Sequence, residues 1–282
     1  MGAVVSLPTA NGSGKKAPVS KHGVIMGKYA SFHDLKNASV YITGGGSGIG
    51  ASLTEGFLAE GAKVAFVQRS DATEFVAEMK DKFGNEPLFM ACDLTDVDAM
   101  KRTIDQAAEA HGPITKLVNN AAYDKRHETM GFSVEEWDAM MAINLRPHFF
   151  TAQACVPGMR AAGGGSIINF SSISYMMGNA GYHSYTAAKA GITGLTRGLA
   201  REFGPDNIRV NALMPGWVLT QRQMDLWADP ESLAAHLKRQ CLKEHLVAQD
   251  VVDATLFLAS DTSRMMTSQS VVVDGGVVVS GC

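Results

Sequence analysis

The chain has 282 residues, with 25 lysine and arginine residues against 28 aspartate and glutamate residues, for a formal net charge of −3. Apolar residues other than glycine make up 46% of the sequence, charged residues make up 19%, and there are 29 glycines. This balance excludes a disordered chain. Because there is no basic excess, we expect no nucleic-acid partner. We also expect no membrane association, since no run approaches the ~18 apolar residues of a membrane span.

The first 30 residues are rich in Gly, Ser, Ala and Lys, so we expect residues 1–30 to form a flexible extension. No apolar segment follows their lysines, which argues against a secretory signal. The cysteines are spaced too widely for a C-x-x-C motif, which favours free thiols in the cytoplasm. The eight histidines show no metal-ligand spacing, so no metal site is expected.

Short apolar runs alternate with segments of helical periodicity after residue 38. The expected strands are residues 40–42, 64–67, 87–91, 114–118, 166–170, 208–213 and 271–273. The expected helices are 49–58, 71–82 beginning at Asp71, 95–111 capped by Thr95, 133–162 bent or interrupted at Pro147 and Pro157, 183–203, 221–246 and 250–260.

The expected strands are apolar at nearly every position, which is typical of strands buried on both faces of a parallel sheet. Strict alternation of strands and helices predicts an α/β fold with right-handed crossovers. We therefore expect residues 31–282 to form a single Rossmann-like domain, a doubly wound parallel sheet of about seven strands with helices on both faces. Residues 214–247 break the alternation and are expected to form a substrate lid.

A glycine cluster, from Thr43 to Gly50, follows the first expected strand and opens the first helix. Glycines allow a positive φ and a close approach of the backbone to a pyrophosphate, and a helix start supplies partial positive charge. In isolation such a cluster can also be a plain tight turn. Its context predicts nucleotide binding. The expected contacts are Gly44, Gly46, Ser47, Gly48, Ile49 and Gly50.

The end of the second strand bears on the choice of nucleotide. An acidic residue there would hold the ribose hydroxyls of NAD, whereas an arginine would accommodate the 2′-phosphate of NADP. Gln68 is neutral and Arg69 can pair with a phosphate, so NADP is favoured. Asp71 is close enough to keep NAD possible.

Tyr185 and Lys189 are four residues apart on an expected helix, so their side chains share one face. A nearby ammonium and a positively charged nicotinamide ring would favour the phenolate and lower the pKa of the tyrosine. Such a tyrosine can exchange a proton with a substrate hydroxyl or carbonyl. In an ordinary helix the same pair could be a buried tyrosine beside a lysine that reaches the solvent.

Taken in order, the Thr43–Gly50 cluster, Asn119-Asn120-Ala121-Ala122, Ser172, Tyr185-x-x-x-Lys189 and Pro215-Gly216 resemble the short-chain dehydrogenase/reductase family. The resemblance covers about residues 35–280 and implies a catalytic set of Ser172, Tyr185, Lys189 and Asn144. Ser172 lies 13 residues before Tyr185, the separation usual in the family. By resemblance, Ser172 bonds to the reacting oxygen, Asn144 anchors a water of a proton relay, and Lys189 also holds the nicotinamide ribose.

The resemblance extends to further cofactor contacts. Ala122 replaces a glycine that the family usually has, which adds a methyl group near the cofactor. The contacts implied by the family are Gln68, Arg69, Asp93, Leu94, Asn119, Ala121, Tyr185, Lys189, Pro215, Gly216, Val218 and Thr220.

The variable segments around the expected cleft are rich in hydrogen-bonding groups, which suits a polyhydroxylated substrate. Their motifs resemble a bacterial subgroup of aldose 1-dehydrogenases that act on sugars such as xylose, arabinose, galactose and fucose. The resemblance implies oxidation at C1 of a pentose or hexose to an aldonolactone, with hydride transfer to the nicotinamide. The candidate substrate residues are Asp124, His127, Ser174, Asn179, Trp217 and Arg222.

Other functions use the same motifs. A carbonyl or 3-oxoacyl reductase, or another secondary-alcohol dehydrogenase, would contain the same catalytic residues. A non-catalytic nucleotide-binding protein is a further alternative, against which the complete Ser172, Tyr185 and Lys189 set argues. The family resemblance also implies a homotetramer or homodimer.

Overall fold

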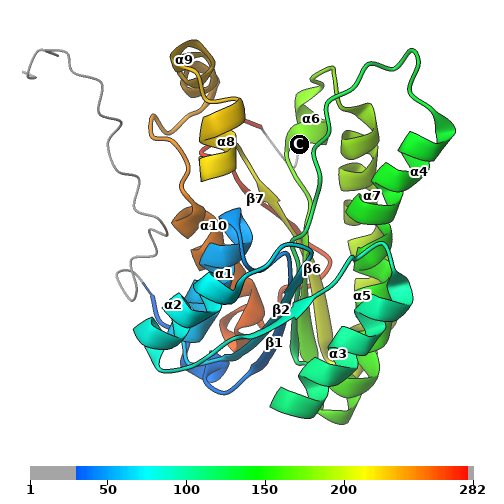
Figure 1. The fold of residues 1–282 in the computed structure, drawn as a ribbon, viewed down its shortest axis with the longest axis vertical. Helices are drawn as coiled ribbons and strands as arrows, with labels where there is room; N and C mark the ends of the chain where they lie inside the picture. The colour runs from blue at the N-terminus through cyan, green and yellow to red at the C-terminus, as the bar shows by residue number, and fades with distance from the viewer. Residues whose placement is uncertain (1–29, 279–282) are drawn as a thin grey trace, which may run out of the picture.

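The computed structural model describes residues 30–278 (Figure 1). The extension expected over residues 1–30 therefore lies outside the described residues, apart from Ala30. Seven parallel strands form one sheet in the order β3-β2-β1-β4-β5-β6-β7, which confirms the expected doubly wound sheet. The strands are β1 (Ser39–Thr43), β2 (Lys63–Gln68), β3 (Leu88–Ala91), β4 (Lys116–Asn119), β5 (Gly165–Phe170), β6 (Ile208–Pro215) and β7 (Ser270–Val273).

Helices cover both faces of this sheet (Figure 1). The α-helices are α1 (Gly48–Ala59), α2 (Thr73–Phe83), α3 (Val97–His111), α4 (Val134–Asn144), α5 (Arg146–Ala161), α6 (Ser174–Met177), α7 (His183–Phe203), α8 (Gln221–Leu226), α9 (Pro230–Arg239) and α10 (Ala248–Ala259). Three short 3₁₀ turns complete the described elements: η1 (His33–Leu35), η2 (Gly204–Asp206) and η3 (Asp261–Ser263).

The core consists of two apolar layers, one on each face of the sheet. Side chains alternate along a strand, so Val40 and Ile42 pack in one layer while Tyr41 packs in the other. The first layer contains residues of α1, α2 and α10, and the second contains residues of α3, α5 and α7. Burial on both faces explains why these strands are apolar at nearly every position.

The strand order reverses between β1 and β4, because β2 and β3 lie on one side of β1 and β4 to β7 on the other. In open α/β sheets, the crevice outside the carboxyl ends of the strands at such a point is where ligands bind. The topology therefore places the segments that follow β1 and β4 next to each other, and the expected site residues lie on these segments.

The helix expected over residues 221–246 is interrupted. It is divided into α8 and α9, and residues 240–247 are not helical. Pro230 begins a new helix, whose first N–H groups, those of Glu231 and Ser232, donate to the Asp229 carboxylate. The Gln240 side-chain amide then donates to the Leu242 and Glu244 carbonyls, which holds the chain in a turn.

Two other expected helix starts are wrong by one or two residues. Asp96, rather than Thr95, caps α3 by accepting a hydrogen bond from the Ala99 N–H at 2.9 Å. The helix expected from Asp71 begins at Thr73, and Asp71 accepts from the Thr73 hydroxyl at 2.7 Å. Short side chains of this kind compete as local acceptors, so sequence alone does not determine which one is the cap.

Pro147 and Pro157 were expected to bend or interrupt the helix over residues 133–162, and an interruption is found beside Pro147. Leu145 separates α4 from α5, and Pro147 lies in the first turn of α5, where a missing N–H costs nothing. Pro157 lies inside α5 without ending it. Among residues 30–278, no helix is both long and apolar enough to cross a membrane.

Candidate active site

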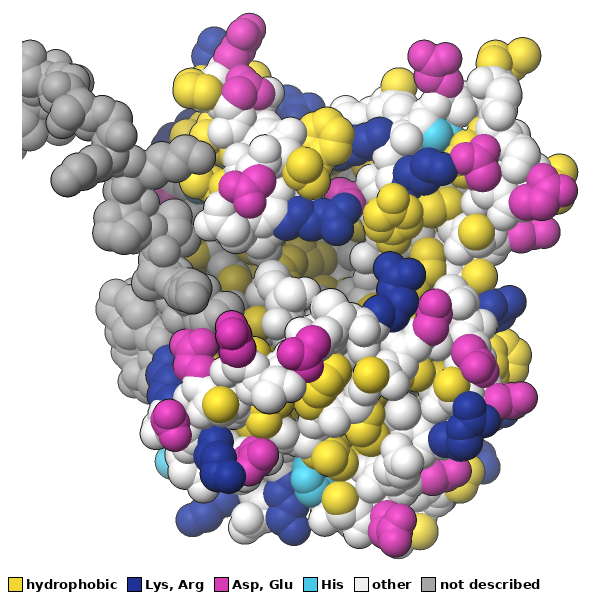
Figure 2. Space-filling model, viewed as in Figure 1, with side chains coloured by type: hydrophobic (Ala, Val, Ile, Leu, Met, Phe, Trp, Pro, Cys, Tyr) yellow, Lys and Arg dark blue, Asp and Glu magenta, His cyan; other side chains and the backbone are white. Residues whose placement is uncertain are grey.

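A cleft of about 1200 Å³ opens at the carboxyl ends of the strands, and Figure 2 shows the hollow below the uppermost segments of the view. Its walls come from the segments that follow β1 to β6 and from α7, α8 and α9. Most of the site residues expected from the sequence line it: Gly44, Ser47, Gly48, Ile49, Gly50, Gln68, Arg69, Leu94, Ala121, Asp124, Ser172, Ser174, Asn179, Tyr185, Lys189, Pro215, Gly216, Trp217, Val218, Thr220 and Arg222.

The glycine-rich loop is tied to the strands on both sides. The Gly44 N–H donates to the Val67 carbonyl at 2.7 Å, and the Asn120 amide donates to the Gly44 carbonyl at 3.2 Å. Gly44 has φ +71°, and a Cβ on Gly50 would lie 1.8 Å from the Gly44 carbonyl oxygen. The loop therefore needs glycine at these positions, as expected for a backbone that curves tightly into a helix.

This loop is suited to a dinucleotide. Ser47 precedes α1 in an extended conformation, and its side chain makes no capping bond to the helix. The first N–H groups of α1 therefore face the cleft without a side-chain partner from Ser47, at the positive end of the helix dipole. NAD(P) carries a pyrophosphate of opposite charge, so the loop and the start of α1 fit the phosphates of this cofactor.

The end of β2 borders the same part of the cleft. The Gln68 side-chain oxygen accepts from the Gly46 N–H at 2.9 Å, and its amide nitrogen donates to Ser70. Arg69 is exposed and lines the cleft. Asp71 does not line it, because its carboxylate accepts hydrogen bonds from Thr73. Of the two residues expected to decide between NADP and NAD, Arg69 therefore reaches the cleft and Asp71 does not.

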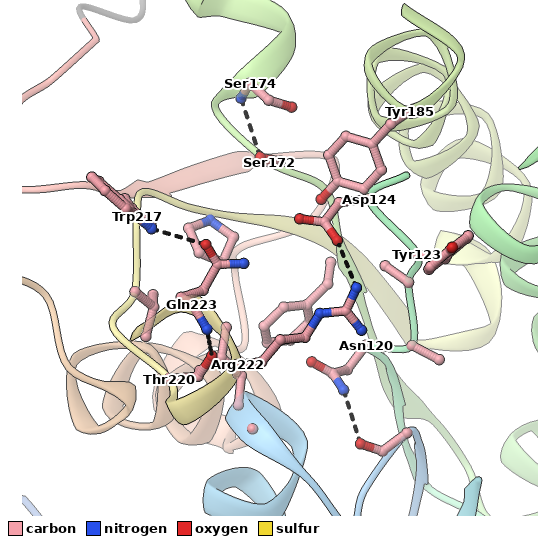
Figure 3. A pocket seen from close by; sticks show the side chains of 18 of the residues that line it. Asn120, Tyr123, Asp124, Ser172, Ser174, Tyr185, Trp217, Thr220, Arg222 and Gln223 are labelled. Carbon is pink, nitrogen blue, oxygen red and sulfur yellow. Dashed lines mark hydrogen bonds and ion pairs between the residues drawn. The ribbon is translucent and has the colours of Figure 1, made fainter. Parts of the chain in front are cut away.

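Ser172, Tyr185 and Lys189 meet at the floor of the cleft. Ser172 follows β5 and its hydroxyl accepts from the Ser174 N–H at 3.1 Å, which places it at the start of α6 (Figure 3). The Lys189 ammonium is buried, donates to the Phe170 carbonyl at 2.7 Å and lies 5.4 Å from the centre of the Tyr185 ring. The neighbouring Ser171 donates to the Lys189 carbonyl, so it is engaged elsewhere.

The electrostatics of Tyr185 and Lys189 are dominated by burial. Burial raises the pKa of Tyr185, the Asp124 carboxylate adds to the rise, and a hydrogen bond with Ser172 acts in the opposite direction. Burial also lowers the pKa of Lys189 to about 7, although Asp124 favours its charged form. In the protein by itself, the pKa of Tyr185 is therefore raised, opposite to the lowering expected from Lys189 and the nicotinamide ring.

Five expected site residues do not line the cleft: Gly46, Asp93, Asn119, Asn144 and His127. Gly46 contacts Gln68, whose side-chain oxygen accepts its N–H. The Asp93 carboxylate accepts from the Thr95 N–H at 2.9 Å and from the Thr95 hydroxyl at 2.8 Å. The amide of Asn119 donates to Asn169 inside the core. The side chain of Asn144 is fully buried and exchanges hydrogen bonds with the Tyr123 backbone at 2.8 Å and 3.0 Å.

His127 belongs to a different surface from the one expected. Its ring stacks on Phe132 with centroids 3.8 Å apart, and its Nε2 lies 2.8 Å from the Ser184 hydroxyl. Its backbone N–H also donates to Gly181. His127 therefore ties the loop after β4 to the start of α7, next to Tyr185, and borders a smaller separate hollow.

The upper wall of the cleft contains polar and aromatic side chains from two distant segments (Figure 3). Asp124, from the loop after β4, forms an ion pair of 3.3 Å with Arg222 of α8. The Trp217 indole N–H donates to the Gln223 side-chain oxygen at 2.9 Å. Arg126 lies 3.9 Å from the ring centre of Tyr182 and 5.1 Å from that of Trp227.

Several lining residues have no sequence motif. His236 of α9 is buried, lines the cleft and contacts Trp217 with ring centroids 5.3 Å apart. Ser232 and Arg239 line the cleft from the same helix. Positions 232, 235, 236 and 239 follow helical spacing, and this periodicity is the signal that could have identified them.

A nucleotide cradle beside a tyrosine that can exchange a proton is typical of one class of enzyme, the oxidoreductases that transfer a hydride to or from NAD(P). A family model described as enoyl-(acyl carrier protein) reductase matches residues 44–278. The chain belongs to the short-chain dehydrogenase/reductase family, which confirms the resemblance seen in the sequence, and dehydrogenases of this family use NAD(P).

The matches to individual relatives extend over nearly the whole length of each relative. The chain is 46% identical over 250 residues to the probable galactose dehydrogenase GalD of Rhizobium meliloti (strain 1021), covering 88% of this chain and 98% of the relative. It is 42% identical over 249 residues to D-xylose 1-dehydrogenase of Caulobacter vibrioides, with the same coverage. A crystal structure of a candidate short-chain alcohol dehydrogenase from Sinorhizobium meliloti 1021 matches with a TM-score of 0.82 at 31% identity, covering 87% of this chain and 98% of that one.

Proposed function

We propose that this enzyme oxidises the C1 hydroxyl of an aldose, a pentose or hexose, to the aldonolactone with NADP as the favoured oxidant and NAD as a possible one. The observation that carries the proposal is the composition of the upper wall, where a carboxylate, a guanidinium and a Trp–Gln pair face the Ser172 and Tyr185 hydroxyls. Such groups match several hydroxyls better than an acyl chain or a steroid. The galactose and xylose dehydrogenases among its relatives support the same substrate class.

The chain's own residues handle the substrate oxygen and its proton. Ser172 donates a hydrogen bond to the anomeric oxygen, and Tyr185 as the phenolate removes its proton. Bound NAD(P) supplies the nicotinamide ring that accepts the hydride. The Lys189 ammonium, held by the Phe170 carbonyl, retains two further N–H donors for the tyrosine side of the cleft. Asn144 fixes the Tyr123 backbone and thereby shapes the floor of the site.

The preference for NADP rests on Arg69. A guanidinium exposed at the edge of the cleft can pair with the 2′-phosphate through charge-assisted hydrogen bonds. The nearby carboxylates of Asp71 and Asp93 are both engaged by threonines. They are therefore poorly placed to hold the ribose hydroxyls of NAD.

Three further expectations belong to this proposal. Residues 214–247 act as the substrate lid, supported by the ion pair and the aromatic contacts that join them to the loop after β4. The exposed Trp137 of α4 and Phe149 of α5 support a homotetramer or homodimer. The enzyme works in the cytoplasm, which agrees with the free thiols of Cys92, Cys155 and Cys241 among the described residues.

The test is an assay of NADP and NAD reduction across pentoses and hexoses, with a 3-oxoacyl thioester assayed in the reducing direction. We expect turnover of at least one aldose, with aldonolactone as the product identified by mass spectrometry. Turnover of the thioester with no aldose oxidation would reject the sugar assignment in favour of the carbonyl reductase. No turnover of any compound would favour the non-catalytic nucleotide-binding protein.

A further inference from the structure

The ion pair between Asp124 and Arg222 joins two segments 98 residues apart in the sequence. Asp124 lies on the loop after β4 and Arg222 on α8, and Figure 3 shows the Asp124 carboxylate between the Tyr185 hydroxyl and the Arg222 guanidinium. About a quarter of the Asp124 side chain is exposed (24%), whereas more than half of Arg222 is (57%). The carboxylate thus faces the reacting tyrosine, and its counter-ion comes from the lid.

Other groups face Tyr185 as well. Arg126, a cation, lies on the same loop as Asp124, and the Ser172 hydroxyl follows β5. Tyr182 precedes α7, and Lys189 lies on α7 one turn after Tyr185. A negative charge beside a phenol opposes its ionisation, and a positive charge favours it. The effect of Asp124 on Tyr185 therefore depends on whether Arg222 stands next to it.

We infer that Arg222 is a positioning residue which neutralises the charge that Asp124 places beside Tyr185, so that Tyr185 ionises more readily and more of it is present as the phenolate that takes the substrate proton. The inference deepens the proposed function and depends on Tyr185 being the base. It assigns a reason for the ion pair: an unpaired Asp124 would hold Tyr185 in its protonated form, and Arg222 cancels that effect.

The lid has a second contact, in which neither Asp124 nor Arg222 takes part. Trp227 follows α8 and packs against Arg126, whose guanidinium also stacks on Tyr182. Replacing Trp227 with leucine loosens the lid but leaves both members of the ion pair in place. This variant separates the loss of lid packing from the loss of the Arg222 charge.

The experiment records kcat/KM for oxidation against pH with any alcohol that the enzyme turns over, since this profile reports the essential base of the free enzyme. The variants are Arg222→Gln, Arg222→Lys, Asp124→Asn, the double variant Asp124→Asn/Arg222→Gln, and Trp227→Leu. We expect the acidic limb to move up by about one pH unit in Arg222→Gln and down by a similar amount in Asp124→Asn. The acidic limbs of Arg222→Lys and of the double variant should stay close to that of the wild type, whatever the change in KM, and Trp227→Leu should raise KM without moving the limb.

The outcomes distinguish an effect of charge on Tyr185 from substrate binding and from lid packing. If Asp124 and Arg222 only bind substrate, their variants raise KM while the acidic limbs superimpose, and the inference is overturned. If Arg222→Gln and Trp227→Leu move the limb equally, lid packing rather than charge is responsible, which also overturns it. If an alcohol is turned over and no aldose is, the sugar assignment fails, but opposite shifts in the two single variants still support the charge pair.

Discussion

The two walls of the cleft are built in different ways. The glycine-rich loop is held by backbone carbonyls, backbone N–H groups and short side chains that are mostly buried, such as the Thr54 hydroxyl on the Gly45 carbonyl at 2.7 Å. The opposite wall, which contains α8, is held to the loop after β4 by long side chains at the surface, such as Arg222 and Trp227. A wall made of backbone has one shape, whereas a wall made of exposed side chains can adjust to its ligand. The difference fits a shared cofactor on one side and a variable substrate on the other.

The largest expected effect lies at the junction of the two walls. Tyr185→Phe removes the only atom that can take the substrate proton in the proposed mechanism, so turnover should fall by about 10³-fold or more. Cofactor binding, followed by fluorescence titration, should change by less than about threefold, because the ring and its packing remain. Tyr175→Phe is the matched control and should retain activity. Turnover of Tyr185→Phe within about tenfold of the wild type would contradict the assignment of Tyr185 as the base.

The next effect tests the rigidity of the backbone wall. Gly50→Ala puts a Cβ 1.8 Å from the Gly44 carbonyl, so the loop must move, and nucleotide affinity should fall by about 100-fold with a lowered Tm. Gly198→Ala makes the same change in the middle of α7, where no atom lies within 4 Å of the new Cβ, and should raise the Tm slightly. Calorimetric titration with NADP measures the affinity of each variant, and thermal unfolding measures its Tm. An unchanged affinity in Gly50→Ala would mean that this wall is adjustable too.

A smaller effect sharpens the cofactor assignment. Arg69→Ser removes a cation from the edge of the cleft, so kcat/KM with NADP should fall by about 10- to 100-fold, the value of a charge-assisted hydrogen bond. With NAD it should change less than about threefold, since NAD has no 2′-phosphate. Arg201→Ser, an exposed arginine near the end of α7, is the control. Equal losses with both cofactors would show that Arg69 supports the fold rather than the phosphate.

The smallest effect concerns stability. Burial lowers the pKa of Lys189 to about 7, below the value in the unfolded chain, so between pH 7 and about 10 the unfolded state binds more protons than the folded state. Stability should therefore rise with pH across this window in the wild type relative to Lys189→Met. The Tm difference between the two proteins should change by a few degrees from pH 6.5 to pH 9.5, about 1 kcal/mol or more in free energy. Parallel curves would contradict the lowered pKa of Lys189 in the folded protein.

Much of the fold could be predicted from sequence because its determinants are local. Each of the seven strands coincides with a short apolar run, and the glycine cluster lies between a strand and a helix in the sequence itself. The spacing of Tyr185 and Lys189 places them on one helix face regardless of the rest of the chain.

The rest depends on contacts between distant residues. The break after α9 is made by the Gln240 side chain bonding to the Leu242 and Glu244 carbonyls, and nothing in the helical periodicity reveals it. His127 was expected in the substrate site, but it does not line the cleft, and its partner Ser184 lies 57 residues away in the sequence. The wall helix containing His236 has no motif at all, and only its periodicity hinted at a packed face.

The hydrogen bond between Gln68 and Gly46 matters to anyone who wishes to redesign the enzyme's coenzyme use. Gln68 and Arg69 are adjacent, and both occupy the place where coenzyme selectivity is set. Gln68, however, also anchors the glycine-rich loop, through the Gly46 N–H at 2.9 Å. An acidic residue introduced at position 68 to attract NAD would have to replace that anchor as well as supply a charge. Selectivity should therefore be engineered at position 69 first, leaving its neighbour untouched.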